Sequence, residues 1–598
     1  MKLFNYLMKH TSLFVAAVML VAMAGCSGCD KNGDKREELL KHVGDDALLV
    51  VTVNMQKYIE SAGGKVEDGT LTVPSAIERL VKDSDEKSAR KALEMISSVK
   101  GLNLQSAVLA LYDDGTSKYG SQKFKGAVLF YITDQDDFKT WIKDAGFDED
   151  KSGDFKGYSY EKEWMQIVLD GDVAYFIPDE KDFSDAVDKV KEMQKSAEDK
   201  KLEQWKVDYL CNEKAAATGL VFVSEFKEVS EELDHVKEIN DDACVLAFEQ
   251  IVDGTHIQTT VKSLDKDGKP ADVVSADNIK SLDPNIFTYF PSDYNFFGAM
   301  SIDGKLFDRI RKDMFRDMNK GLIELLFGDN IDNHTRPQYD EYGYYSYSYY
   351  NPLRVAIDSI SRGPAFRNPC DNATTLGLGL GITSGASIDF NNPERILEYI
   401  SSRATLSFSS PDYASSYYKA WSDLNMTGEV ANDQAIEFSP YYLPNKMYMM
   451  RKSNDIILSS ARTFDTASHS FPCKLDDAVA FAQVSVPKDD PLMKALPVSI
   501  DFGLKVWAVA TRNSVTIDMA LTDAEGGFIE NLLNLTTKLI SNFGGFGRGY
   551  QNSNYVEEPW YADSVAAAER YYSDSTYDSC DYAPVAEEAV AVEDEYYY

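Results

Sequence analysis

The chain has 598 residues, of which 44% are hydrophobic, and a formal net charge of -36. This length and composition suit a globular protein with two or more domains and sizeable cores. Because nucleic-acid phosphates and anionic lipid surfaces repel so acidic a chain, we expect no nucleic-acid partner.

The first residues have the pattern of an export signal. Two lysines precede an apolar stretch over residues 11–24, which is too short for a relaxed membrane span, and two small residues then precede Cys26. This resembles the lipobox of bacterial lipoproteins. We predict a signal peptide over 1–25 and acylation of Cys26, because only a cysteine thiol can accept the acyl group. The alternative is an ordinary secretory signal followed by an incidental cysteine.

The next residues, 26–43, begin small and polar and are predicted to be a tether. Over 44–272, apolar alternation and helical spacing predict a first α+β domain. Asp170-Gly171 and Asp253-Gly254 predict two-residue hairpin turns. The expected strands are 47–53, 107–112, 124–132, 157–161, 166–169, 172–177, 219–223, 244–252 and 255–262, with helices from Val73, over 134–145 and over 181–197.

A similar order of elements returns over 284–541, which predicts a tandem duplication. The expected strands are 295–302, 374–383, 404–409, 435–438, 447–450, 455–458, 477–486, 503–511 and 514–521, with helices over 305–327, 411–424 and 525–540. The predicted fold class is therefore α+β, with two related domains of mixed, largely antiparallel sheets packed with helices.

Two tyrosine-rich segments break this pattern. The tail, 542–598, is acidic and has too little aliphatic content for a core, so we expect it to be disordered. The insertion, 329–369, carries clustered tyrosines that suit a contact loop, although an unselected low-complexity loop is the alternative. The candidate binding residues are Tyr342, Tyr344, Tyr345, Tyr347, Tyr349 and Tyr350.

Three other motifs are each ambiguous. Glycines over 377–381 fit a sheet strand with close packing better than a phosphate loop, because no helix follows. The stretch 265–268 fits a turn better than a calcium loop. The polar stretch 329–334 is a candidate metal site or a hydrophilic loop. We expect no metal or other cofactor. Cys211 and Cys244 fall in one predicted domain and could pair.

The lipobox at Cys26, the Asp45-Asp46-Ala47 start of the first strand and the block over 124–177 together resemble a family of large Bacteroides-type lipoproteins that contain a domain of unknown function. The resemblance extends over most of 44–540. It implies an envelope location and a duplicated α+β body. It supplies no activity and no functional residues.

These patterns predict an outer-membrane lipoprotein, attached to the lipid bilayer through acylated Cys26, with a non-enzymatic role. It would bind a protein or glycan partner or act as an envelope scaffold, on either the periplasmic or the surface side. The alternative is an envelope hydrolase that cleaves glycan or peptide with acidic residues. Carboxylates are too abundant in this chain for any catalytic pair to be singled out.

Overall fold

The computed structural model describes residues 33–67, 70–72, 99–116, 122–160, 165–178, 180–223, 240–327, 336–339, 345–348, 359–383, 393–424, 435–440, 444–462, 464, 466–496 and 498–550. The chain divides into two compact units, 1–539 and 540–598. The helix predicted from Val73 and the acylation site Cys26 lie outside the described residues. None of the helices in these ranges is long and apolar enough to cross a membrane.

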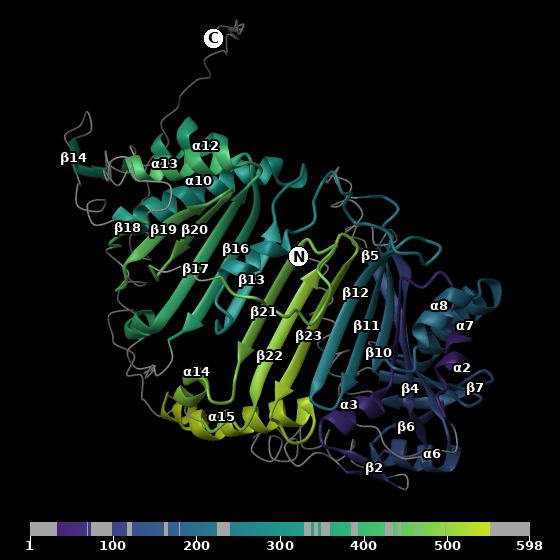
Figure 1. The fold of residues 1–598 in the computed structure, drawn as a ribbon. Helices are drawn as coiled ribbons and strands as arrows, with labels where there is room; N and C mark the ends of the chain where they lie inside the picture. Colours follow the sequence, from purple (N-terminus) through teal and green to yellow (C-terminus); the bar gives the residue numbers. More distant parts are fainter. Residues whose placement is uncertain are drawn as a thin grey trace, which may run out of the picture. The chain divides into compact units, whose positions relative to one another are not determined.

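Nineteen strands of the first unit form one sheet, and each strand pairs antiparallel with its neighbours (Figure 1). From one edge to the centre, the strands are β6 (Asp148–Ser152), β7 (Phe155–Tyr160), β8 (Met165–Asp170), β9 (Val173–Ile177), β5 (Gln122–Ile132), β4 (Leu102–Thr116), β1 (Leu49–Val53), β10 (Ala217–Phe222), β11 (Val245–Asp253) and β12 (His256–Leu264). From the centre to the other edge, they are β23 (Ser514–Thr522), β22 (Gly503–Ala510), β21 (Ala480–Val486), β13 (Phe296–Ser301), β16 (Ala373–Ile382), β17 (Ile400–Phe408), β20 (Asp455–Ser459), β19 (Met447–Lys452) and β18 (Ile436–Phe438).

Helices pack on both faces of this sheet, so the predicted α+β class with antiparallel strands is confirmed. The helices in the described ranges are α2 (Arg36–Leu40), α3 (Met55–Ser61), α6 (Gln135–Asp144), α7 (Phe183–Asp199), α8 (Gln204–Leu210), α10 (Leu306–Phe327), α12 (Pro364–Cys370), α13 (Pro411–Leu424), α14 (Pro491–Ala495) and α15 (Phe528–Tyr550), with the 3₁₀ helices η3 (Pro284–Tyr289) and η5 (Pro393–Tyr399). Two small hairpins lie outside the large sheet: β2 (Lys65–Glu67) with β3 (Thr70–Thr72), and β14 (Arg336–Tyr339) with β15 (Tyr345–Ser348).

The two predicted hairpins are present, but each two-residue turn lies one residue later than predicted, at Gly171-Asp172 and Gly254-Thr255. Asp170 pairs with Val173, and Asp253 pairs with His256, across turns in which Gly171 and Gly254 adopt positive φ. Glycine adopts these angles without the steric cost that a side chain would add. A glycine at the first position of each turn therefore helps to fix the register of the hairpin.

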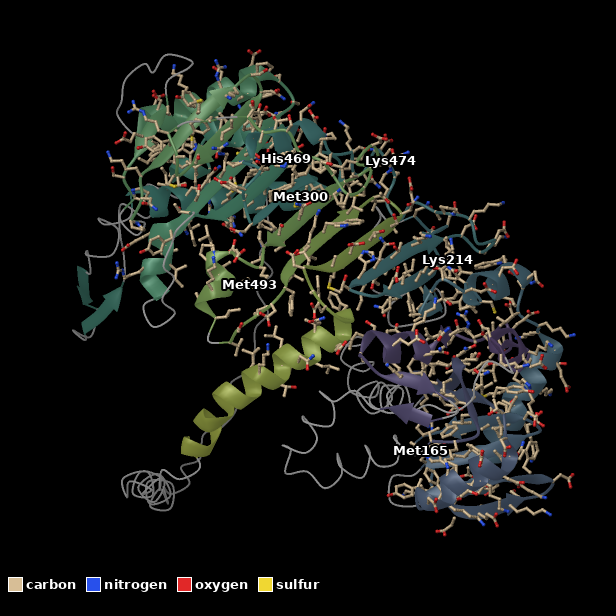
Figure 2. All side chains as sticks on the ribbon, turned by 60° about the horizontal axis from the view of Figure 1, so that its bottom comes forward. Met165, Lys214, Met300, His469, Lys474 and Met493 are labelled. Atoms are coloured by element: carbon tan, nitrogen blue, oxygen red, sulfur yellow. The ribbon has the colours of Figure 1, made fainter. Side chains whose placement is uncertain are left out.

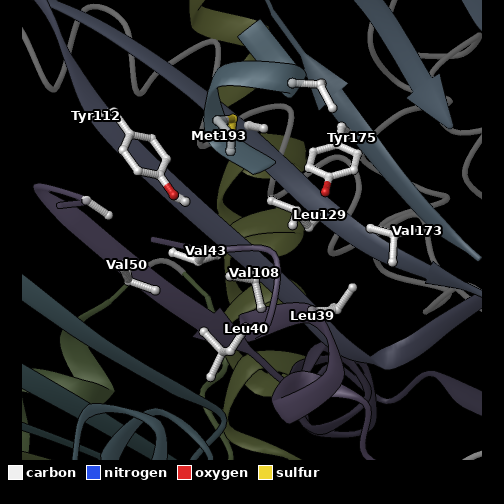
Figure 3. Packing of buried hydrophobic residues seen from close by; sticks show 14 of the residues in the cluster. Leu39, Leu40, Val43, Val50, Val108, Tyr112, Leu129, Val173, Tyr175 and Met193 are labelled. Carbon is white, nitrogen blue, oxygen red and sulfur yellow. The ribbon is translucent and has the colours of Figure 1, made fainter. Parts of the chain in front are cut away.

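The core of the first half begins earlier than the boundary predicted at residue 44. Helix α2 lies inside the predicted tether, and its residues Arg36, Leu39 and Leu40 are buried. Leu39 and Leu40 pack with Val50 and Val108 on one face of the sheet, and helices α7 and α8 cover the same cluster (Figure 3). The described part of the predicted tether therefore belongs to the folded body.

Cys211 and Cys244, which could have formed a disulfide, are both free thiols. Burial raises the pKa of the Cys211 thiol to about 11, so the reactive thiolate is scarce at neutral pH.

Candidate functional site: an open apolar sheet face

One face of the seven central strands is apolar, and the described helices leave its middle exposed; we call it the open face. Directly paired residues of neighbouring antiparallel strands point to the same side of a sheet, so the strand registers define its members. One row across the seven strands runs Gln250, Thr259, Ile517, Ala508, Ala482, Gly298 and Leu378. With the adjacent rows, the open face consists of Leu246, Phe248, Gln250, Val252, Ile257, Thr259, Val261, Ser263, Val515, Ile517, Met519, Val506, Ala508, Ala510, Ala480, Ala482, Val484, Phe296, Gly298, Met300, Leu376, Leu378 and Leu380. Val252, Ile257 and Ser263, at its margin, are buried.

None of these side chains carries a charge, and several are unusually exposed. Leu378 is 45% exposed, Val515 44% and Ile517 41%. Among the described residues, seven of the ten large hydrophobic side chains that are exposed lie on this face: Leu246, Val261, Met300, Leu378, Leu380, Val515 and Ile517. Single exposed aliphatic residues are ordinary on a protein surface, but a contiguous set marks an interaction site.

Helices border the open face without covering its centre (Figure 1). On the same side of the sheet, α3 and α6 pack over the strands of the first half, and α10, α12 and α13 pack over β16, β17 and β20. At one end of the central strands, Phe528 of α15 packs with Ile257 and Leu521. The described helices thus surround the apolar centre of the open face, and this centre is exposed to solvent.

Polar residues of β12 and β23 lie on the opposite face and hold these two central strands in register. His256 Nε2 lies 2.6 Å from a carboxylate oxygen of Asp518, and the Gln258 side-chain amide donates to the same oxygen at 3.0 Å. Asp518 is buried. A slip of one residue would exchange the two faces of β12, so this polar link helps to keep Val261 on the open side.

The Gly-Leu alternation of β16 follows from the different packing on its two faces. A side chain on Gly379 would lie 2.6 Å from a ring carbon of Phe290, and one on Gly381 would lie 2.7 Å from the ring of Tyr294. These glycines therefore admit an aromatic layer on the covered face, where His469 also packs against Phe297, while Leu378 projects to the open face. The strand interpretation of this motif is confirmed. Figure 2 labels His469 and Met300 in this part of the sheet.

Small side chains form a low strip through the middle of the open face, which we call the alanine strip. It consists of Ala508 and Ala510 on β22, Ala480 and Ala482 on β21, and Gly298 on β13. Larger side chains flank it on β23 and on β16. Since neighbouring strands are about 4.8 Å apart, the two alanine-bearing strands give the strip a width of about 10 Å.

Two of the tyrosines predicted as a binding surface lie in described residues outside the large sheet. Tyr345 and Tyr347 belong to β15, in the separate hairpin, at alternate positions opposite Tyr339 and Pro337. Tyr342, Tyr344, Tyr349 and Tyr350 lie outside the described residues, as does the candidate metal site at 329–334. The described part of the chain holds no group of three or more His, Cys, Asp or Glu side chains that could bind a metal ion.

The turn interpretation of 265–268 is confirmed. The Asp265 carboxylate accepts the backbone N–H groups of Asp267 at 2.9 Å and Lys269 at 2.8 Å, and Gly268 adopts positive φ. This carboxylate is therefore used to close the turn.

Fold and site together define an α+β protein with a large antiparallel sheet and an exposed apolar face. No family model matches the chain, and no curated protein matches it significantly. Three solved structures, crystal forms III, I and IV of TP0453, share 10%, 9% and 8% sequence identity with it. They cover 38%, 39% and 38% of this chain and 78%, 80% and 83% of their own, each with a TM-score of 0.23. So low a TM-score supports no conclusion about fold or function.

Proposed function

We propose that this protein is a lipid-anchored outer-membrane lipoprotein with a non-catalytic binding role, and that the open face is its binding surface. The observation that carries the proposal is the gathering of exposed aliphatic side chains on one uncharged face. Burial of apolar surface stabilises a complex by about 25 cal/mol per Å², so an apolar partner that covers this face gains affinity.

The anchor rests on sequence: the lipobox at Cys26 and the resemblance to Bacteroides-type lipoproteins support attachment to the bilayer. Acylation at more than one position gives stable anchoring where a single chain does not.

The chemistry of the open face favours an apolar partner over a glycan. Of its polar side chains, Gln250 and Thr259 are already engaged, because the Gln250 amide donates to Thr259 Oγ1 at 2.9 Å and the Tyr58 hydroxyl donates to the Gln250 carbonyl. The third, Ser263, is buried and does not face solvent. A glycan needs donors and acceptors for its hydroxyls, and those that stay unpaired weaken binding. Of the partners expected from the sequence, a protein suits this face better than a glycan. The hydrolase alternative stays a prediction without a specific observation in its favour.

The proposal includes two related halves, over 44–272 and 284–541. Leaving out β6, the outermost strand of the first half, nine strands in each half follow the same order toward the centre of the sheet, which supports the proposal. The equivalent last strands, β12 and β23, pair with each other about Thr259 and Ile517, with His256 opposite Ala520 and Lys262 opposite Ser514. This pairing has the symmetry expected when equivalent strands of two copies meet.

Site-specific photo-crosslinking in intact cells tests the binding role. A benzophenone amino acid in place of Ile517 is expected to give a discrete adduct, because that side chain would lie beneath the partner. The control is the same substitution at Asp267, which is exposed in a turn away from the open face. The absence of an adduct at Ile517, or equal labelling at both positions, would refute the role.

A further inference from the structure

On the open face, a strip of small side chains lies between larger ones, an arrangement that suits linear hydrocarbon chains. The alanine strip runs along β21 and β22, and continues from Ala508 and Ala482 to Val506 and Val484. Larger side chains stand on both sides, among them Ile517 on β23 and Leu378 on β16. Because an extended hydrocarbon chain is about as wide as the spacing between strands, two such chains fit side by side along the strip.

Hydrogen bonding argues against an extended peptide lying along the alanine strip. The strands beneath the strip are paired on both sides, so their backbone donors and acceptors are already used in the sheet. A peptide in extended form would lose its own hydrogen bonds to water and find no replacements. Hydrocarbon has no hydrogen bonds to lose.

The negative charge of the chain disfavours anionic lipids as ligands. The chain carries a formal net charge of -36, which opposes both self-association and the approach of a fatty-acid carboxylate or an anionic headgroup. A zwitterionic headgroup has no net charge to be repelled. The bilayer to which acylated Cys26 would attach the protein supplies such lipids at high local concentration.

We propose that the alanine strip binds the two acyl chains of a zwitterionic phospholipid; this rests on the binding role proposed for the open face. The headgroup remains in water at the margin of the face, and the chains lie along β21 and β22. Binding is non-covalent.

The test uses the mature chain, residues 26–598, with Cys26→Ser so that no acyl group of its own is present. A fluorescent phosphatidylcholine is the probe, and the matching phosphatidylglycerol supplies the anionic arm. Ala508→Trp and Ala482→Trp each place a large ring in the strip and are expected to weaken phosphatidylcholine binding at least tenfold. Asp267→Trp adds the same ring to the exposed turn and is expected to change nothing.

Thermal unfolding separates lost binding from lost folding. Because Ala508 and Ala482 project from the uncovered side, their tryptophan variants are expected to unfold at the temperature of the parent chain. If a variant fails to fold, Ile517→Asp, which alters an already exposed position, provides the second measurement. Binding that persists in all folded open-face variants, or equally tight binding of phosphatidylglycerol, would overturn the proposal.

The two proposals fail separately. If the parent chain binds no phosphatidylcholine while the crosslinker at Ile517 captures a protein, the lipid assignment falls and the binding role of the open face stands. If neither assay gives a product, both fall.

Discussion

Gly379→Val is expected to lower the free energy of unfolding by about 1–3 kcal/mol, the usual range for overfilling a packed core. Valine suits strands, so the loss would come from packing alone. Its Cβ would lie 2.6 Å from Phe290 and 2.8 Å from Tyr294. Phe290 is fully buried among Phe287 and Phe297, so its ring cannot move aside without disturbing its neighbours. Denaturant unfolding measures the change.

The matched control is Leu380→Val, in the same strand on the opposite side. Leu380 is exposed on the open face, so shortening it is expected to change stability by no more than about 0.5 kcal/mol. Equal losses for the two variants would mean that both faces of β16 are packed, in conflict with an open face.

Cys26→Ala is expected to abolish palmitate incorporation and to release the protein from the outer-membrane fraction. Alanine offers no thiol for acylation, so the acyl chains that hold the protein at the bilayer are never attached. Metabolic labelling with radioactive palmitate and fractionation of the envelope measure the two effects. Cys29→Ala, only three positions away, is the control and is expected to keep full labelling. Label that still enters the Cys26→Ala protein would assign the anchor to another residue.

Local signals allowed much of the fold to be predicted. The hairpin after Asp253 follows from a glycine, Gly254, that accepts positive φ, and the amphipathic spacing of α6 and α13 is evident in sequence. Short elements were missed, including α3, α8 and β6, because about two turns of helix or an exposed acidic strand leave no clear periodicity. Helix α2 was missed because a polar tether was expected there.

The joining of both halves into one sheet could not be predicted, since the β12–β23 pairing links residues far apart in sequence. The candidate site was missed for a related reason. Strand alternation shows that a strand has an apolar side, but not which side is covered. In β12 and β23 the polar residues lie on the side opposite the open face, where buried Asp518 bonds to the half-buried His256 and Gln258, and the apolar residues lie on the open face. Tyrosine composition pointed to β15 instead, away from the large sheet.

The most direct test of the open face is the reactivity of a thiol placed on it. Ile517→Cys in the mature chain is expected to react with a maleimide at about the rate of Asp267→Cys in the exposed turn, as measured by mass spectrometry of the labelled peptides. Buried Cys370, whose pKa is raised by burial to about 12, provides a slow internal reference. A rate at position 517 that matches the exposed turn supports an uncovered binding surface. A rate as slow as that of Cys370 would show that another part of the chain covers this face, and would contradict it.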